Sequence, residues 1–133
     1  MAEKQSMNIL SKPRCVIIES PYAATAERTK EQHRAYLLAA MRYCVERNES
    51  PVASHHWLPD ILDDNGPYER QLGIRCGVVW GERADLIAVF SDLGVSTGMK
   101  QAIEVYKTLG KPIEWRSLDT RVVRKILGMD IAA

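Results

Sequence analysis

Short apolar runs alternate with longer helix-compatible segments along this chain, and this alternation constrains its fold more than any other feature. The clearest runs are Asp85–Phe90, which reads DLIAVF, and Arg14–Glu19, which reads RCVIIE. Continuous β-branched runs of this length are typical of strands that are buried on both faces. Shorter strands are expected at Pro51–Ser54 and Lys111–Trp115. Because strands that alternate with helices pair in parallel, the sequence predicts a three-layer α/β domain with a parallel sheet of about four strands.

The segments between these strands carry apolar residues at three- and four-residue spacing, which predicts helices packed against the sheet. We expect them at Thr25–Arg47 with Thr25 as N-cap, at Pro67–Arg83, at Met99–Leu109, and after Asp119. The side chains expected to be buried by the first two helices are Leu37, Leu38, Met41, Cys44, Val45, Leu72, Cys76, Val79 and Trp80.

The length of the chain fits one domain. It has 133 residues, and single domains most often contain about 100–150. The segment Met1–Lys12 is polar and lacks the apolar core of a signal peptide. We therefore expect a flexible leader over residues 1–12 and a single domain over residues 13–133.

The charge of the chain argues against some classes of partner. Its formal net charge is +1, which gives no reason to expect nucleic acid or an anionic membrane. No apolar run approaches the roughly 20 residues that span a bilayer. The three cysteines, Cys15, Cys44 and Cys76, lie far apart in apolar stretches. We interpret them as reduced, buried thiols of a cytoplasmic protein.

The segments that follow the strands are the candidate binding segments, because ligands of parallel α/β sheets bind beyond the carboxyl ends of the strands. They are Ser20–Tyr22, Ser54–Asp64 and Ser91–Met99. In Gly94–Met99, which reads GVSTGM, two glycines permit close backbone approach and a helix begins. This turn suits a phosphate, a sugar hydroxyl or a carboxylate. Its spacing matches neither the Walker nor the dinucleotide pattern, and a plain capped turn remains the alternative.

The other two segments offer groups that suit a nucleobase. Tyr22 is placed to stack on a base or to bond a sugar. His55 and Asp60 have the donors and acceptors to recognise ring nitrogens, although a solvated loop is the alternative. Adjacent histidines at 55 and 56 do not share a face, and no further ligand completes a metal pattern. We therefore expect neither a metal nor a cofactor.

Several of these runs together resemble a known family. The runs SPYA, PVASHHWLPDILDD, GPYERQLG, ADLIAVFSDLGVSTGMKQAIE and LGKPIEWR resemble the nucleoside 2-deoxyribosyltransferase-like proteins, in particular their short bacterial and bacteriophage branch. The resemblance covers Arg14–Arg116. It implies a flavodoxin-like, Rossmann-like domain, a homo-oligomer, and a location in the cytoplasm of a bacterium or of a phage-infected host. It also implies base exchange at an N-glycosidic bond, in which a helix glutamate attacks the anomeric carbon.

The chain departs from this family at the position of the nucleophile. Counting back from Gly110 places that glutamate on Ala102, and alanine cannot be a nucleophile. Glu104 lies further along the helix, rotated by about 200°. Two hypotheses follow. In the first, the protein binds a nucleoside or nucleotide without chemistry, to sequester or sense it. In the second, it is a deoxyribosyltransferase or an N-glycoside hydrolase that uses Glu104 or Asp92.

The candidate residues fall into two sets. The candidate ligand-binding residues are Ser20, Pro21, Tyr22, His55, Asp60, Asp92, Gly94, Ser96, Thr97, Gly98 and Met99, and the candidate catalytic residues are Glu104 and Asp92. The sequence leaves open which base is bound and whether the ligand carries phosphate.

Overall fold

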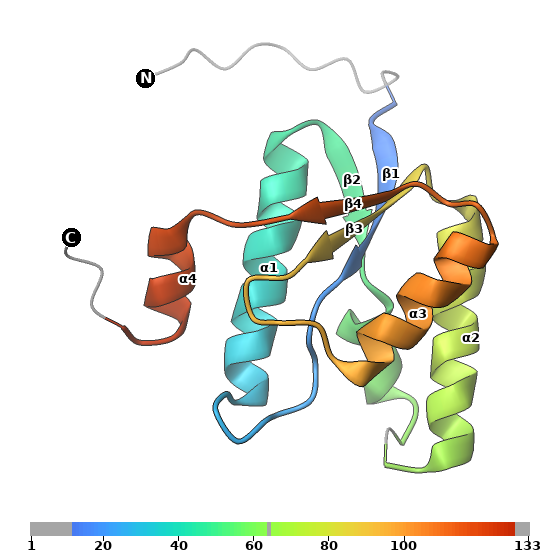
Figure 1. The fold of residues 1–133 in the computed structure, drawn as a ribbon, viewed down its shortest axis with the longest axis horizontal. Helices are drawn as coiled ribbons and strands as arrows, with labels where there is room; N and C mark the ends of the chain where they lie inside the picture. The colour runs from blue at the N-terminus through green and yellow to red at the C-terminus, as the bar shows by residue number, and fades with distance from the viewer. Residues whose placement is uncertain (1–11, 64, 130–133) are drawn as a thin grey trace.

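The computed structural model describes residues 12–63 and 65–129, which form a parallel sheet of four strands (Figure 1). The strands are β1 (Arg14–Glu19), β2 (Glu49–Val52), β3 (Leu86–Phe90) and β4 (Ile113–Arg116), in the spatial order β2-β1-β3-β4. Every neighbouring pair is parallel. The predicted α/β class and parallel sheet are confirmed. The predicted leader, except Lys12, lies outside the described residues.

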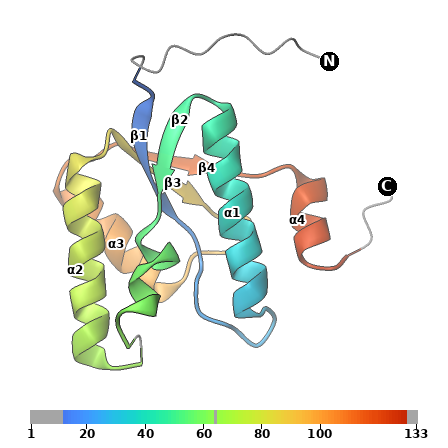
Figure 2. The same cartoon turned by 180° about the vertical axis from the view of Figure 1, so that it is seen from behind.

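Helices cover both faces of the sheet and make the domain three layers thick (Figures 1 and 2). On one face lie α1 (Lys30–Glu46) and α4 (Thr120–Ile126), which contact each other. On the other face lie α2 (Pro67–Arg83) and α3 (Thr97–Thr108), which also pack together. Two short 3-10 helices, η1 (Ser54–His56) and η2 (Leu58–Asp60), connect β2 to α2. None of the helices in the described segments has the length and apolar character needed to cross a bilayer.

The two inner strands are buried on both faces, which explains their continuous apolar runs. Successive side chains of a strand point to opposite faces. Ile18 and Phe90 therefore join the core under α1, whereas Ile17 and Val89 join the core under α3. The residue that follows this alternation at the end of β1 is Glu19, which consequently points toward α2 and α3.

The structure corrects two predicted helix starts. α1 begins at Lys30 rather than near Thr25, because Thr29 and Gln32 form a reciprocal capping box. The hydroxyl of Thr25 instead accepts hydrogen bonds from the backbone N–H groups of Glu27 and Arg28, in the turn that leads into α1. α3 begins at Thr97 rather than Met99, because the hydroxyl of Ser96 accepts from the backbone N–H of Met99. In both helices, the hydroxyl of the residue just before the first helical turn provides the N-cap.

The buried face of α2 is also corrected. Cys76, Val79 and Trp80 are exposed rather than buried, whereas Gly77 and Gly81 are buried. A side chain at Gly81 would collide with the ring of Tyr106 on α3. The helix therefore approaches its neighbours through glycines, a close packing that a search for an apolar stripe does not detect.

The burial predicted for side chains of α1 and for the three cysteines is only partly confirmed. In α1, Leu37 and Cys44 are buried as expected, whereas Leu38 and Val45 are exposed. Tyr36 and Ala40 fill the core positions instead. Of the three cysteines, Cys44 is buried, whereas those at 15 and 76 are exposed. The buried face of α1 is thus rotated from the predicted one. It begins at His33 and includes Tyr36 and Ala40, which the prediction left out.

A buried ion pair links the two edges of the sheet. Both terminal nitrogens of Arg116, at the end of β4, donate to the carboxylate of Glu49, at the start of β2, at 2.6 and 2.7 Å. Arg14 donates to the same carboxylate at 2.9 Å. The predicted strands Pro51–Ser54 and Lys111–Trp115 did not include Glu49 and Arg116. In the structure both residues belong to strands, and the ion pair connects them.

Candidate functional site

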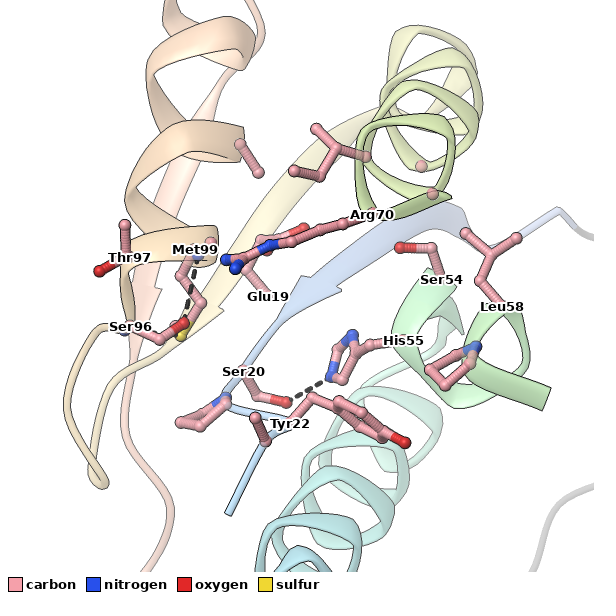
Figure 3. A pocket seen from close by; sticks show the side chains of 18 of the residues that line it. Glu19, Ser20, Tyr22, Ser54, His55, Leu58, Arg70, Ser96, Thr97 and Met99 are labelled. Atoms are coloured by element: carbon pink, nitrogen blue, oxygen red, sulfur yellow. Dashed lines mark hydrogen bonds between the residues drawn. The ribbon is translucent and has the colours of Figure 1, made fainter. Parts of the chain in front are cut away.

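A cavity of about 600 Å³ opens at the carboxyl ends of the strands, between α2 and α3 (Figure 3). Its wall is built by the segment after β1, by η1 and η2, by the first turns of α2, and by the loop that leads from β3 into α3. Its volume lies within the roughly 300–1,000 Å³ of small-molecule sites. The topology places the cavity where parallel α/β sheets bind their ligands.

One wall is the turn that begins α3. Gly94 has a φ of 89°, a backbone conformation that glycine adopts without strain. Thr97 and Gly98 form the first turn of α3, where backbone N–H groups have no acceptor within the helix. A Cβ atom at Gly98 would lie 3.5 Å from a terminal nitrogen of Arg70, which comes from α2. Free N–H groups beside a guanidinium form an environment that favours oxygen atoms with negative charge.

The opposite wall carries Tyr22, Ser20 and His55. The hydroxyl of Ser20 and Nε2 of His55 are 2.8 Å apart (Figure 3). Burial, with a contribution from neighbouring His56, lowers the pKa of His55 to about 4. His55 is therefore a neutral ring at neutral pH, with one nitrogen that donates and one that accepts. The half-buried ring of Tyr22 has the Lys30 ammonium 5.1 Å from its centroid.

Glu19 lines the cavity from the end of β1, and it is buried, with 9% of its surface exposed. The hydrogen bonds and ion pairs among the described residues include none to its carboxylate. Burial raises the pKa of this carboxyl from 4.5 to about 8. In the described residues, every side-chain oxygen or nitrogen that is shut off from solvent has a partner. The carboxylate of Glu19 is therefore not completely shut off from solvent, and it faces the cavity that it lines.

Most of the sequence-predicted residues come together in this cavity. Those that line it are Ser20, Pro21, Tyr22, His55, Gly94, Ser96, Thr97, Gly98 and Met99. Ala102 also lines it, as part of the α3 wall, and packs against the core beneath. The position that the family resemblance assigned to a nucleophile thus faces the cavity and offers it a methyl group.

The remaining predicted residues lie outside the cavity. The carboxylate of Asp92 accepts hydrogen bonds from the hydroxyl of Tyr36 at 2.6 Å and from the backbone N–H of Leu118 at 2.9 Å. It therefore holds the loop after β3 to the α1 side of the sheet. Glu104 is exposed on α3, 3.4 Å from the ammonium of Lys107. Asp60 lines a smaller neighbouring hollow.

Sequence reasoning missed Glu19 and Arg70 as site residues. Glu19 was interpreted as the end of a strand, although a charged residue that closes an apolar run is a detectable signal. Arg70 entered the sequence analysis only as part of the run GPYERQLG. The carboxylate of its neighbour Glu69 accepts a hydrogen bond from the backbone N–H of Asp63. The approach of Arg70 to Gly98 depends on how α2 and α3 pack, which local patterns do not encode.

Within residues 12–63 and 65–129, no group of three or more His, Cys, Asp or Glu residues is arranged to hold a metal ion. The polar groups that line the cavity are hydroxyl, imidazole, guanidinium and backbone groups, with the buried carboxyl of Glu19 and the carboxylate of Glu69. This set is suited to hydrogen bonding with an organic ligand.

Comparison with known proteins gives a family and a fold. The profile of the family "Domain of unknown function (DUF7768)" matches residues 14–116, and the chain belongs to this family. No curated protein matches the chain. Among solved structures, the fold is similar to that of a 2-deoxyribosyltransferase from the psychrotolerant bacterium Bacillus psychrosaccharolyticus. The TM-score is 0.60 at 12% identity, over 84% of this chain and 80% of that one, and this likeness shows a shared fold.

Proposed function

We propose that this DUF7768 member binds a nucleoside or a nucleotide in the cavity and sequesters or senses it, without transferring its sugar. The observation that carries the proposal is one cavity with two unlike walls. The wall at the start of α3 suits anionic or hydroxyl oxygens, and the wall around Tyr22 suits a flat ring. The shared fold with a 2-deoxyribosyltransferase supports the same class of ligand.

Each wall has a specific part in this proposal. The N–H groups of Thr97 and Gly98, with the guanidinium of Arg70, would bind phosphate or sugar oxygens. The ring of Tyr22 would stack on the base. The neutral His55, oriented by Ser20, would recognise a base edge with one donor and one acceptor.

Binding without sugar transfer follows from where the carboxylates lie. Covalent transfer needs a nucleophile beside the anomeric carbon. Ala102 provides none, and Asp92 and Glu104 lie outside the cavity, engaged with other groups. Of the two carboxyl groups that line the cavity, Glu69 accepts a hydrogen bond from the backbone N–H of Asp63. Burial raises the pKa of the other, Glu19, to about 8, so that it is mostly neutral at pH 7, and a neutral carboxyl is a poor nucleophile.

Thermal denaturation with a ligand panel tests the proposed function. The panel holds deoxynucleosides, ribonucleosides, their 5′-monophosphates and NAD, and chromatography follows whether each compound stays intact. A ligand at 100 times its Kd stabilises the protein by about 2.7 kcal/mol. Stabilisation by an intact nucleoside or nucleotide supports the proposal, and a panel without any stabilising compound contradicts it.

Gly98→Val is expected to weaken binding of the stabilising ligand by roughly tenfold or more while leaving the fold intact. An added Cβ meets only the flexible end of Arg70, so the helix tolerates it. The rest of the valine side chain displaces the guanidinium and covers the N–H groups. Isothermal titration calorimetry measures the loss of affinity. Gly98→Ala adds only a methyl group and is expected to cause a smaller loss. An unchanged Kd in folded Gly98→Val would remove this turn from the site.

We also propose that the protein is a homo-oligomer. Trp80 and Val79 on the outer side of α2 are 53% and 44% exposed, and large apolar side chains gathered on a surface are typical of protein interfaces. Multi-angle light scattering is expected to give a multiple of the 15.0 kDa chain mass. The mass of a monomer at micromolar concentration would contradict this proposal.

A further inference from the structure

The buried carboxyl of Glu19 is the group in the cavity whose chemistry the proposed function leaves unused. Burying a polar group without a hydrogen-bond partner costs free energy. Glu19 is buried, lines the cavity and receives no hydrogen bond from the described residues. A protein that keeps such a group on a cavity wall has a ready acceptor and donor for a bound molecule.

The position of Glu19 between the two walls indicates which part of the ligand it would meet. Glu19 ends β1, which lies between β2 and β3 in the sheet, so it lies between η1 with His55, which follows β2, and the turn with Ser96, which follows β3. In Figure 3 the side chain of Arg70 crosses in front of it. The proposed function places phosphate or sugar oxygens at the first wall and the base at the second. In a nucleotide, the sugar joins these two parts. A ligand that spans the cavity therefore brings its sugar over Glu19.

We propose that Glu19 is the sugar-recognising residue of this cavity and that, as a neutral carboxyl group, it exchanges hydrogen bonds with a hydroxyl of the ribose or deoxyribose. A neutral carboxyl has one O–H donor and a carbonyl acceptor, which match the acceptor and donor of a hydroxyl. This inference rests on the proposed function. It assigns a specificity-determining role to a residue of β1, whereas the family resemblance implied a carboxylate on α3.

The groups that face Glu19 are compatible with a neutral carboxyl. Tyr106 of α3 is a buried phenol whose pKa is raised by burial and further by the charge of Glu19. His55 of η1 is neutral at neutral pH. From α2, Glu69 is engaged with the backbone of Asp63. The ion pairs among the described residues do not include one between Arg70 and Glu19. Burial consequently decides the protonation state of Glu19.

The test compares the hydroxyl preference of wild type with that of variants at Glu19. The probes are the 5′-monophosphates of the four common ribonucleosides with their 2′-deoxy and 3′-deoxy analogues, titrated by calorimetry at pH 6.5 and pH 9.5. Glu19→Gln keeps one donor and one acceptor, and Glu19→Ala removes both. Glu82→Gln, at an exposed position of α2 outside the cavity, is the matched control.

Wild type is expected to lose about tenfold in affinity when one hydroxyl is removed, and to bind more weakly at pH 9.5 than at pH 6.5. Glu19→Ala binds about tenfold more weakly at pH 6.5 and no longer distinguishes the analogue. Glu19→Gln retains binding at both pH values. The control behaves as wild type. Circular dichroism confirms that each variant is folded.

Three outcomes overturn the inference. Equal affinities of wild type and Glu19→Ala, with the same preference among analogues, show that Glu19 does not contact the sugar. Loss of binding in Glu19→Gln as large as in Glu19→Ala shows that the ionised carboxylate is required. Failure of wild type to bind any probe or any compound of the thermal panel overturns the proposed function together with this inference. The first two outcomes, in which wild type still binds a nucleotide, overturn only the role of Glu19.

Discussion

Glu19→Gln is expected to increase the free energy of unfolding by roughly 3–5 kcal/mol at pH 9 and to change it little near pH 4. Burial raises the pKa of the folded-state carboxyl from 4.5 to about 8. The stability that this group contributes is therefore fully present below pH 4.5, and is lost as the pH rises toward about 8, because the unfolded chain ionises first. Glutamine does not titrate, so the variant lacks this loss.

Urea unfolding of ligand-free wild type and Glu19→Gln, followed by circular dichroism between pH 4 and pH 9, measures the difference. Glu82→Gln is the control, since its carboxylate is exposed in α2. The wild-type curve should fall away from the Glu19→Gln curve as the pH rises. Parallel curves would show that Glu19 ionises in the folded protein as it does in water, and that the carboxyl is better solvated than its burial indicates.

Glu49→Gln is expected to destabilise the protein by up to about 3–5 kcal/mol at pH 7. The buried guanidinium of Arg116 then loses its two shortest charged hydrogen bonds and keeps only the exposed carboxylate of Glu114 as a charged partner. Arg116 makes its two shortest hydrogen bonds to this carboxylate, at 2.6 and 2.7 Å, and both side chains are buried. These bonds lower the pKa of Glu49. Its contribution to stability is thus present above its ordinary pKa and is lost as the pH falls through the lowered one.

A double-mutant cycle with Arg116→Met separates the pair from the two side chains. The double variant Glu49→Gln/Arg116→Met is expected to be more stable than the sum of the single losses predicts, because no unpaired charge remains in it. Urea unfolding gives each free energy. A loss below about 1 kcal/mol in Glu49→Gln, the size typical of exposed pairs, would show that water reaches this ion pair in solution.

The sequence was sufficient to predict the layers of the fold and the edge at which the cavity lies. The run at β3 is apolar without interruption because both faces of that strand are covered, and this pattern survives in any parallel sheet. The residues of Gly94–Met99 were found because a turn between a strand and a helix carries its own local signals, glycine and a capping hydroxyl.

The features that the sequence did not predict depend on how separate helices and strands pack against each other. The face of α2 that packs on α3 is glycine, and the close approach at Gly81 is visible only against the ring of Tyr106. Likewise, the last residue of β1 becomes a cavity residue only because α2 and α3 cover that face of the sheet. Asp92, predicted to contact ligand, lies outside the cavity, where its carboxylate accepts a hydrogen bond from the hydroxyl of Tyr36 on α1.

The location of the ligand is the most direct test of the account, and amide chemical-shift mapping measures it. A ¹⁵N-labelled protein is titrated with the compound that stabilises it most in the thermal panel. We expect the largest shifts at Tyr22, His55, Thr97 and Gly98, and small shifts at Glu104 and over α4. Shifts that gather instead over α4 or in the hollow beside Asp60, or their absence with every nucleoside and nucleotide, would contradict a nucleoside site in this cavity.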